Sequence, residues 1–181
     1  MGAILPPDPV LLLFAVFSRH DAAFAWAERR VVERFGPLAA KSAAFAFVET
    51  DYYDESMGTG LRKQFWAIQQ PFDPGELAEL KIETNAWEQE YAASGTHDEP
   101  RPLNIDPGYL TLGKLVLAST KDHAHRIYLR QGVYAEITLY YQHKQWHATP
   151  WTFPDYQRAD YQRFFSECRD TIRQRRTEFQ R

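Results

Sequence analysis

The sequence predicts an α+β fold, a ferredoxin-like βαββαβ sandwich with an added C-terminal β-hairpin and helix. Strand-like segments alternate with segments of helical periodicity in the order strand, helix, strand, strand, helix, strand. A hairpin pattern and a third helical segment follow residue 121. We therefore expect one domain over residues 1–181, with a core at residues 8–120 and an extension at residues 121–181.

The first half of the core begins with a continuous apolar run at residues 10–17, which predicts a buried strand. Ser18 and Asp21 resemble a capping box at the start of a helix, and that helix ends before Gly36-Pro37. Its expected apolar face consists of Phe24, Ala27, Val31 and Phe35.

The next strands are expected at residues 43–50 and 61–69, joined by a polar, glycine-containing loop at residues 51–60. Asp73-Pro74-Gly75-Glu76 predicts the start of the second helix, because it combines an N-cap residue with a proline at the first helical position. The helix should end at Ser94-Gly95. Residues 109–119 are expected to form one strand with a β-bulge at Gly113.

The extension begins with residues 126–130 and 133–142, which flank Gln131-Gly132 and predict a hairpin. Alternation along the second strand places Val133, Ala135, Ile137 and Leu139 inward, and Tyr134, Glu136, Thr138 and Tyr140 on the opposite face. The final helix is expected to have an apolar stripe formed by Tyr161, Phe164, Phe165, Cys168 and Ile172.

Composition bounds the class of protein. The hydrophobic fraction of 44% and the aromatic fraction of 15% are typical of a folded globular chain, and a net charge of -3 selects no nucleic acid or membrane partner. The single cysteine, Cys168, favours a reducing, cytoplasmic setting. Residues 10–17 are too few to span a bilayer, and no basic segment of a signal peptide precedes them.

A candidate ligand site lies in residues 101–109, predicted as a loop, where Arg101, Asn104, Asp106 and Tyr109 stand among two prolines and a glycine. In the expected fold this loop shares one edge with the loops at residues 18–21 and 51–60. That edge would bring together Asp51, Asp54, Glu55, Arg62, Arg101, Asn104 and Asp106.

Arginine binds phosphate oxygens bidentately and carboxylates bind divalent ions, so these residues favour a small phosphorylated or nucleotide-like ligand with a divalent metal. The expected ligand-binding residues are Arg101, Asn104, Tyr109, Lys114, Tyr53 and Arg62. The expected metal ligands are Asp51 and Asp106, and Asp106 is also the candidate catalytic base of a hydrolytic reaction. Alternatively, Asp106 caps a turn, Arg101 pairs with it structurally, and the carboxylates of the second loop are merely solvated.

A second cluster contains His123, His125, Arg126 and Glu136. On an extended strand the two imidazoles would share a face, but two histidines do not complete a metal shell, and hydrogen-bonded structural histidines are the alternative. A straight strand would separate Asp106 from His123 by about 30 Å. The two clusters can therefore share a site only if the chain bends back at Gly113.

A different class of function is a noncatalytic RNA-binding or protein-interaction module, and sheet-edge pairing would also permit a homodimer. The aromatic residues that suggest base stacking are Tyr134, Tyr140, Trp146 and Trp151. The basic residues of the last helix are Arg169, Arg173, Arg175, Arg176 and Arg181. Cations near a helix C-terminus also complement its dipole, and we favour this interpretation of the arginines over RNA binding. The phosphate-loop, dinucleotide-binding and common hydrolase motifs are absent from the sequence.

Several motifs resemble the domain of unknown function family 4416 of prokaryotic proteins over nearly the full length. These are Thr50-Asp51-Tyr52-Tyr53 with Met57-Gly58, residues 101–109 with Lys114, residues 121–126, residues 134–136 and residues 150–156. The resemblance implies kinship and carries no activity, substrate or cofactor. Ser56 departs from the family pattern, which has an acidic residue before Met-Gly, and this weakens a metal role for that loop.

Overall fold

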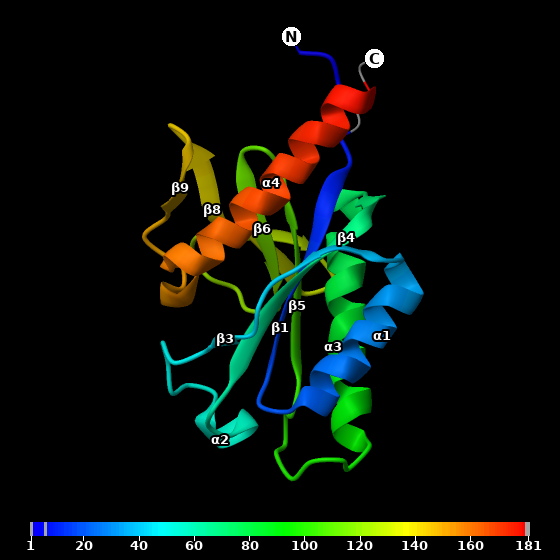
Figure 1. Ribbon diagram of the computed structural model, residues 1–181, viewed down its shortest axis with the longest axis vertical. Helices are drawn as coiled ribbons and strands as arrows, with labels where there is room; N and C mark the ends of the chain where they lie inside the picture. The colour runs from blue at the N-terminus through cyan, green and yellow to red at the C-terminus, as the bar shows by residue number, and fades with distance from the viewer. Residues whose placement is uncertain (1, 6, 180–181) are drawn as a thin grey trace.

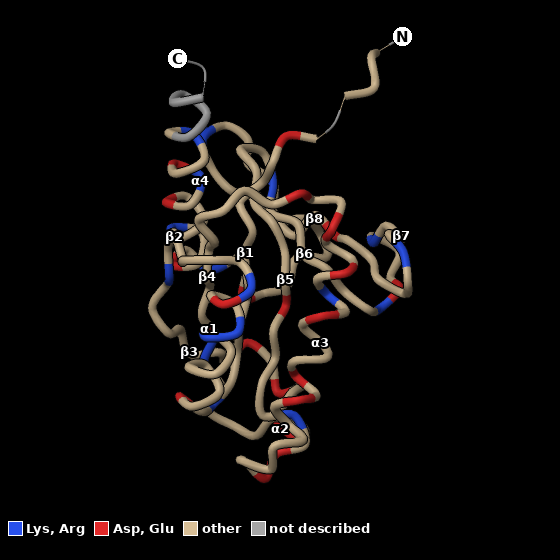
Figure 2. Tube along the Cα trace, turned by 90° about the vertical axis from the view of Figure 1, so that its right-hand side faces the viewer, with Lys and Arg blue, Asp and Glu red and all other residues tan. Residues whose placement is uncertain are grey.

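The computed structural model describes residues 2–5 and 7–179. Within these residues the chain has an α+β fold with four α-helices and a nine-stranded antiparallel sheet (Figure 1). The α+β class predicted from the sequence is therefore confirmed. Basic and acidic positions are interspersed along the described trace (Figure 2).

The sheet is built around β1 (Val10–Ser18), all nine residues of which are buried. It pairs with β4 (Arg62–Phe72) on one side and with β5 (Asn104–Leu110) on the other. The strand order is β2-β4-β1-β5-β6-β8-β7, with β3 beside β4 and β9 beside β8. The remaining strands are β2 (Leu38–Lys41), β3 (Phe45–Ala46), β6 (Lys114–Ser119), β7 (Ile127–Arg130), β8 (Val133–Gln142) and β9 (Gln145–Ala148).

Both faces of the central strands are covered by helices. Because side chains alternate along a strand, β1 contributes to two separate cores. Val10, Leu12, Phe14 and Val16 pack with α1 (Asp21–Phe35) and α3 (Leu77–Ala93), whereas Leu11, Leu13 and Ala15 pack with α4 (Ala159–Phe179). Tyr161, Phe164, Phe165 and Cys168 are all buried, as expected for the last helix. Short helical turns complete the chain at α2 (Asp54–Met57), η1 (Pro74–Glu76) and η2 (Pro154–Gln157).

The stretch expected to be one bulged strand is instead two strands, β5 and β6, joined by a turn at residues 111–113. The hydroxyl of Thr111 accepts from the backbone N–H of Gly113 at 3.1 Å, and the Thr111 N–H donates to the carbonyl of Lys114 at 2.9 Å. These local bonds reverse the chain where a bulge would only have kinked it. The segment after β6 is thereby carried back toward the beginning of β5.

The predicted ligand loop is also mostly strand, because Asn104–Leu110 pairs with β1 along its whole length. β6 pairs only with Gly108, Tyr109 and Leu110, so the first half of β5 has a strand neighbour on one side alone. Pro107 lacks an N–H, and this half-edge position tolerates it. Polar side chains that we expected on a loop are therefore held by a rigid sheet.

The region expected to be the second strand, residues 43–50, contains only the two-residue strand β3, and β2 lies before it. Ser42 interrupts the pairing, because its hydroxyl accepts from the Phe65 N–H at 2.9 Å in place of a strand carbonyl. The expected capping box is also wrong. The Ser18 hydroxyl donates to the carbonyl of Pro102 at 2.6 Å, and His20 is the N-cap of α1 without a side-chain cap bond.

The hairpin at Gln131-Gly132 is confirmed, with φ of 53° and 77° at the two turn residues. The predicted inward face of β8 is correct for the burial of Val133 and Leu139 but wrong at its middle, because Ile137 is 46% exposed while Glu136 and Thr138 are buried. In the pairing with β6, Leu139 faces Leu115 but Ile137 faces Val116, so Thr138 is an extra residue. This irregularity switches the strand face, so Leu139 packs in the core beside α4, whereas Val133 packs against Leu77 and Ala78 of α3. Glu136 lies on the face opposite Val133 by simple alternation.

Candidate functional site

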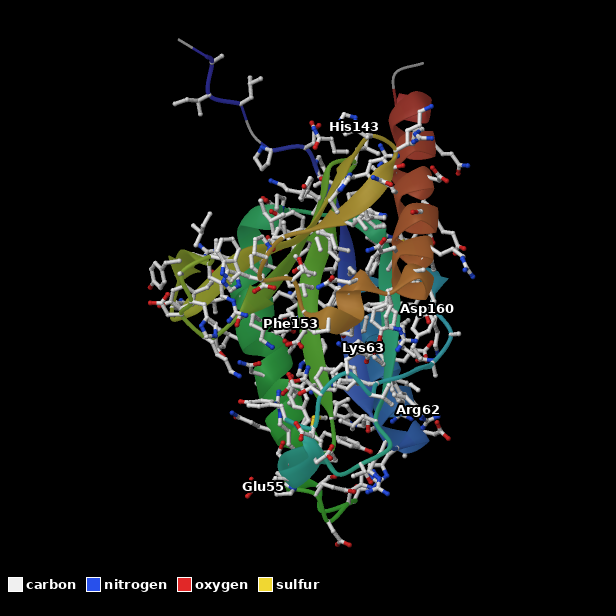
Figure 3. The ribbon with its side chains drawn as sticks, turned by 90° about the vertical axis from the view of Figure 1, so that its left-hand side faces the viewer. Glu55, Arg62, Lys63, His143, Phe153 and Asp160 are labelled. Carbon is white, nitrogen blue, oxygen red and sulfur yellow. The ribbon has the colours of Figure 1, made fainter. Side chains whose placement is uncertain are left out.

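A cavity of about 850 Å³ lies beside the open half of β5. Its walls come from α3, from the beginning of β5, from the segment around Tyr52 and Tyr53, and from the segments after β6 and around η2. Lys63 and Phe153, which both line it, lie at mid-height of the face shown in Figure 3, above Glu55 of α2. This volume is within the range of small-molecule sites in proteins.

One wall is a chain of charged and polar side chains from α3 and β5. The carboxylate of Asp106 accepts from Lys81 Nζ at 2.8 Å and from Asn104 Nδ2 at 2.7 Å. Arg101 donates to the Asn104 side-chain carbonyl and to Glu88 Oε2, the latter at 3.1 Å. Glu88 Oε1 accepts from the backbone N–H of Ile105 at 2.8 Å. The network connects the helix to the strand and orients Arg101.

The two carboxylates of this wall differ in their ionisation. Burial opposes ionisation of Asp106, but the charge and hydrogen bond of Lys81 and the hydrogen bond from Asn104 hold the pKa of Asp106 below its ordinary value. Burial raises the pKa of Glu88. A carboxylate with a lowered pKa and both oxygens engaged is a weak base, so the geometry favours Asp106 as a residue that positions Asn104 and Lys81.

The opposite wall is organised by Glu136, which is 3% exposed. Its Oε2 accepts from Arg126 Nε at 2.7 Å and contacts His125 Nε2 at 3.1 Å, and its Oε1 accepts from the Thr138 hydroxyl at 3.1 Å. The His125 ring stacks between those of His123 and Trp151, with centroid separations of 5.9 and 5.2 Å. The second predicted cluster is thus a hydrogen-bonded structural unit with His123 at the cavity surface.

The rim of the cavity combines aromatic rings with a lysine. Lys121 Nζ donates to the Tyr52 hydroxyl at 3.0 Å and lies 4.7 Å from the centre of that ring. The hydrogen bond from Lys121 lowers the pKa of Tyr52, and the charge of Arg101 acts in the same direction. Burial and the nearby charge of Asp106 raise the pKa of Tyr53 to about 12. Cations and phenol rings therefore meet at one opening.

Beneath the rim lies a buried ion pair between Lys63 and Asp155. Their side chains are 6% and 4% exposed, and Lys63 Nζ is surrounded by the rings of Phe17, Phe47 and Tyr156 at 5.0, 4.4 and 5.1 Å. Burial raises the pKa of Tyr156 well above its ordinary value. The pair links β4 to η2 and closes the cavity on that side.

The structure brings together most residues of the two predicted clusters. Arg101, Asn104, Asp106, Tyr53, His123, Arg126 and Glu136 all line the same cavity. Asp106 and His123 share it because the chain turns back at residues 111–113, which was the condition set by the sequence. The three predicted loops also meet, since the Ser18 hydroxyl reaches the Pro102 carbonyl and the Arg101 N–H donates to Ser56 at 2.9 Å.

Other predicted residues lie elsewhere. Tyr109 and Lys114 line a second hollow of about 670 Å³, near Pro7 and Thr111. Arg62 pairs with Asp21 at 2.7 Å instead of facing the cavity. Asp51 is exposed and is not among the lining residues, so the structure does not bring Asp51 and Asp106 to one metal site.

Sequence reasoning missed Lys81, Glu88, Lys63, Asp155 and Lys121 as lining residues. A signal for two of them was present. Lys81 and Glu88 are charged but lie seven residues apart on the apolar face of α3, where burial requires a partner. Nothing in the local sequence pairs Lys63 with Asp155, which are separated by 92 positions.

Two of the residues that suggested RNA binding, Trp146 and Arg169, have structural contacts. Trp146 is buried and donates to the Ser166 hydroxyl at 3.1 Å. Arg169 donates to the Leu112 carbonyl at 2.7 Å and lies 3.8 Å from the Tyr141 ring centre. The side chains of Arg175 and Arg176, and the whole of Arg181, lie outside the described residues.

A separate group of side chains lies where the loop before α1 meets the segment between α3 and β5. The potential ligand atoms of His20, His97 and Glu99 lie within 4.8 Å of one another, so this group could hold a metal ion. His20 Nε2 is 3.0 Å from Glu99 Oε2. This cluster, and not the predicted pair of aspartates, is the group of potential metal ligands found among the described residues.

The chain belongs to the family described as Domain of unknown function (DUF4416), which matches residues 8–171. The family resemblance noted in the sequence is therefore confirmed. A comparison with curated proteins found no match, and a comparison with solved structures found none either. No helix in the described part of the chain has the length and apolar character that crossing a membrane requires.

Proposed function

We propose that the cavity binds a small phosphorylated, nucleotide-like ligand. The observation that carries this proposal is the placement of Arg101 and Lys121 beside aromatic rings at the same opening. Within the described residues Lys121 forms no ion pair, and its ammonium donates to the hydroxyl of Tyr52. A ligand phosphate would take this ammonium from a weaker acceptor, since charge-assisted hydrogen bonds are the stronger ones.

Arg101 is suited to the same anion. Both of its side-chain bonds in the described structure use Nη2, and the side chain is 39% exposed. Its acceptors, Glu88 and Asn104, are fixed by the backbone of β5 and by Asp106, so the guanidinium is held in one orientation. A preorganised fork of this kind matches phosphate oxygens with little further loss of side-chain freedom.

The aromatic part of the rim supports a planar group on the ligand. Phe153 is 44% exposed and Tyr52 is 65% exposed, and both line the cavity. Exposed rings beside bound phosphate are typical of sites that stack a base. The cavity of about 850 Å³ has room for a phosphate together with a nucleoside.

The proposed activity is binding, and the sequence-based hydrolytic role of Asp106 has little support. The lowered pKa of Asp106 and its bonds to Lys81 and Asn104 reduce its strength as a base and as a metal ligand. The proposal therefore assigns it the positioning of Arg101 through Asn104. The strand order β2-β4-β1-β5, with α1 and α3 on one face, supports the ferredoxin-like arrangement that carries this site.

The test is thermal unfolding of the full chain with inorganic phosphate, adenosine and ADP, using K121M and the matched control K114M. Lys114 lines the second hollow, so its replacement removes the same charge away from the site. At about 100 times its dissociation constant ADP should add about 2.7 kcal/mol, which raises Tm by roughly 5 to 11 °C. K121M should lose most of that shift and K114M should keep it.

Equal shifts in K121M and K114M would refute the site, and the absence of any shift with ADP or phosphate would refute the ligand class. A shift with adenosine equal to that with ADP would show that the aromatic rim acts without the cations. That result would also contradict the proposal. Isothermal titration of the wild-type protein with ADP gives the dissociation constant that sets the concentrations.

A further inference from the structure

The cluster of His20, His97 and Glu99 is held together by tertiary structure. His20 is the N-cap of α1, and the other two residues belong to the segment between α3 and β5. None of the three side chains lines the cavity, so the cluster is separate from the proposed ligand site. Two imidazoles and a carboxylate nevertheless present three donor atoms within 4.8 Å.

We propose that His20, His97 and Glu99 bind one Zn²⁺ ion, with a fourth position open to water. Zn²⁺ takes nitrogen and carboxylate oxygen ligands at about 2.0–2.2 Å, and two ligands of a tetrahedron with such bonds lie about 3.3 Å apart. The observed 3.0 Å between His20 Nε2 and Glu99 Oε2 is close to that edge. Only His97 has to move appreciably toward the other two.

The surroundings orient these ligands from behind. The Tyr91 hydroxyl contacts His97 Nε2 at 2.9 Å, which leaves Nδ1 of the same ring for the ion. Arg19 Nη1 lies 3.3 Å from Glu99 Oε1, which leaves Oε2 for the ion. Partners on the far side of a metal ligand fix its orientation and are a regular feature of metal sites.

The two imidazoles stack with centroids 3.6 Å apart and an angle of 12° between their planes. Lone pairs in parallel planes do not aim at one point, so metal binding requires one ring to rotate out of the stack. His97 has this freedom because it lies in a segment of turns and bends, whereas His20 immediately precedes a helix. Ion binding should therefore change the environment of the Tyr91 ring, which contacts His97.

The ion can exchange with solvent, since the side chains of His20 and Glu99 are 24% and 17% exposed. Glu99 is two residues before Arg101, whose backbone N–H is bonded to the carbonyl of Ser56. The ion would thus join the loop before α1 to the segment that carries Arg101. The metal site is independent of the proposed ligand, and its test does not use that ligand.

The experiment is titration of the full chain with Zn²⁺ alone, by calorimetry and by competition with a chromophoric chelator, on protein first stripped of metal. We expect one ion per chain and at least a roughly 100-fold weaker affinity in H97N and in E99Q. Y91F should bind Zn²⁺ about 10- to 100-fold more weakly than the wild type, because it keeps all three ligands and removes the hydroxyl that contacts His97. The matched control is H143N, at the turn between β8 and β9 at the opposite end from Glu55 (Figure 3).

Co²⁺ provides a second readout on the unaltered protein, because tetrahedral Co²⁺ absorbs visible light much more strongly than octahedral Co²⁺. The expected spectrum is the intense one, and H97N should abolish it while circular dichroism stays unchanged. Wild-type affinity in both H97N and E99Q would overturn the proposal. So would loss of binding in H123N, which would assign the ion to the other histidine pair, and so would absence of Zn²⁺ binding by the wild-type protein.

Discussion

Replacing Lys63 with methionine is expected to destabilise the protein by about 3–4 kcal/mol at pH 7. The variant leaves the carboxylate of Asp155, which is 4% exposed, without its cation. Removing one partner of a buried ion pair costs about 3–5 kcal/mol. The unpaired aspartate can instead become neutral by binding a proton. For an aspartate of ordinary pKa this costs about 4 kcal/mol at pH 7, which is the upper limit of the destabilisation.

The same reasoning predicts how the loss depends on pH. Because protonation becomes easier in acid, its cost falls by about 1.4 kcal/mol for each pH unit. Urea unfolding of K63M and the wild type at pH 7 and pH 5 measures both values. Below pH 7 the difference between the two proteins should shrink. A difference under about 1 kcal/mol at pH 7, or one that does not change with pH, would refute the reasoning.

Two further variants separate charge burial from packing. K63M/D155N carries neither charge, so it should be more stable than K63M although it bears one more substitution. The matched control is E79Q, which breaks the exposed pair of Glu79 and Arg130, with side chains 47% and 51% exposed. That variant should lose less than about 1 kcal/mol. Additive losses in the double variant would show that methionine merely packs badly among the three rings.

Three other predictions concern different parts of the chain. A Cβ on Gly108 would lie 2.3 Å from the carbonyl oxygen of Val116, so G108A should lower the free energy of unfolding by about 1–3 kcal/mol, measured with urea. Gly113 faces open space, so G113A should change it by less than about 0.5 kcal/mol. Equal effects of the two substitutions would contradict this reasoning. Burial raises the pKa of Cys168 to about 12, so iodoacetamide should label the thiol only after unfolding, and rapid labelling of the native protein would disprove its burial. Despite burial, Lys81 and Asn104 lower the pKa of Asp106. The wild type should therefore be more stable than D106N above about pH 4, and this difference should be lost as the pH falls through the lowered pKa. A difference in unfolding free energy that stays constant from pH 6 to pH 2.5 would exclude this linkage.

Several parts of the fold followed from local sequence. The apolar run became the central buried strand β1, and Asp73 caps the start of the second helical region by accepting from the Gly75 N–H at 2.8 Å. The turn at Gln131-Gly132 was also predicted correctly. Both residues adopt the positive φ that such hairpins require. In each case the sequence signal, an apolar run, a capping residue or a turn dipeptide, lies within a few consecutive residues.

Other parts depended on pairing between distant segments. The face of β8 changes at Thr138 because of its register with β6, and no periodicity in β8 alone reveals the extra residue. By contrast, residues 109–119 have the apolar content of one long strand, and local bonds of Thr111 to Gly113 and Lys114 make them two strands. The sequence-based prediction of secondary structure failed where the local sequence is compatible with two conformations, such as one bulged strand or two strands joined by a turn.

For the candidate site, the sequence by itself determined which chemical groups were present in residues 101–109 and 121–126, and it identified the family. Tertiary structure decided that both segments line one cavity, that Lys81 and Asn104 engage Asp106, and that His20 meets His97 and Glu99. The physical reason is that residue types and short-range periodicity are properties of the chain, whereas the burial, pKa and partners of a side chain depend on which distant segments pack against it.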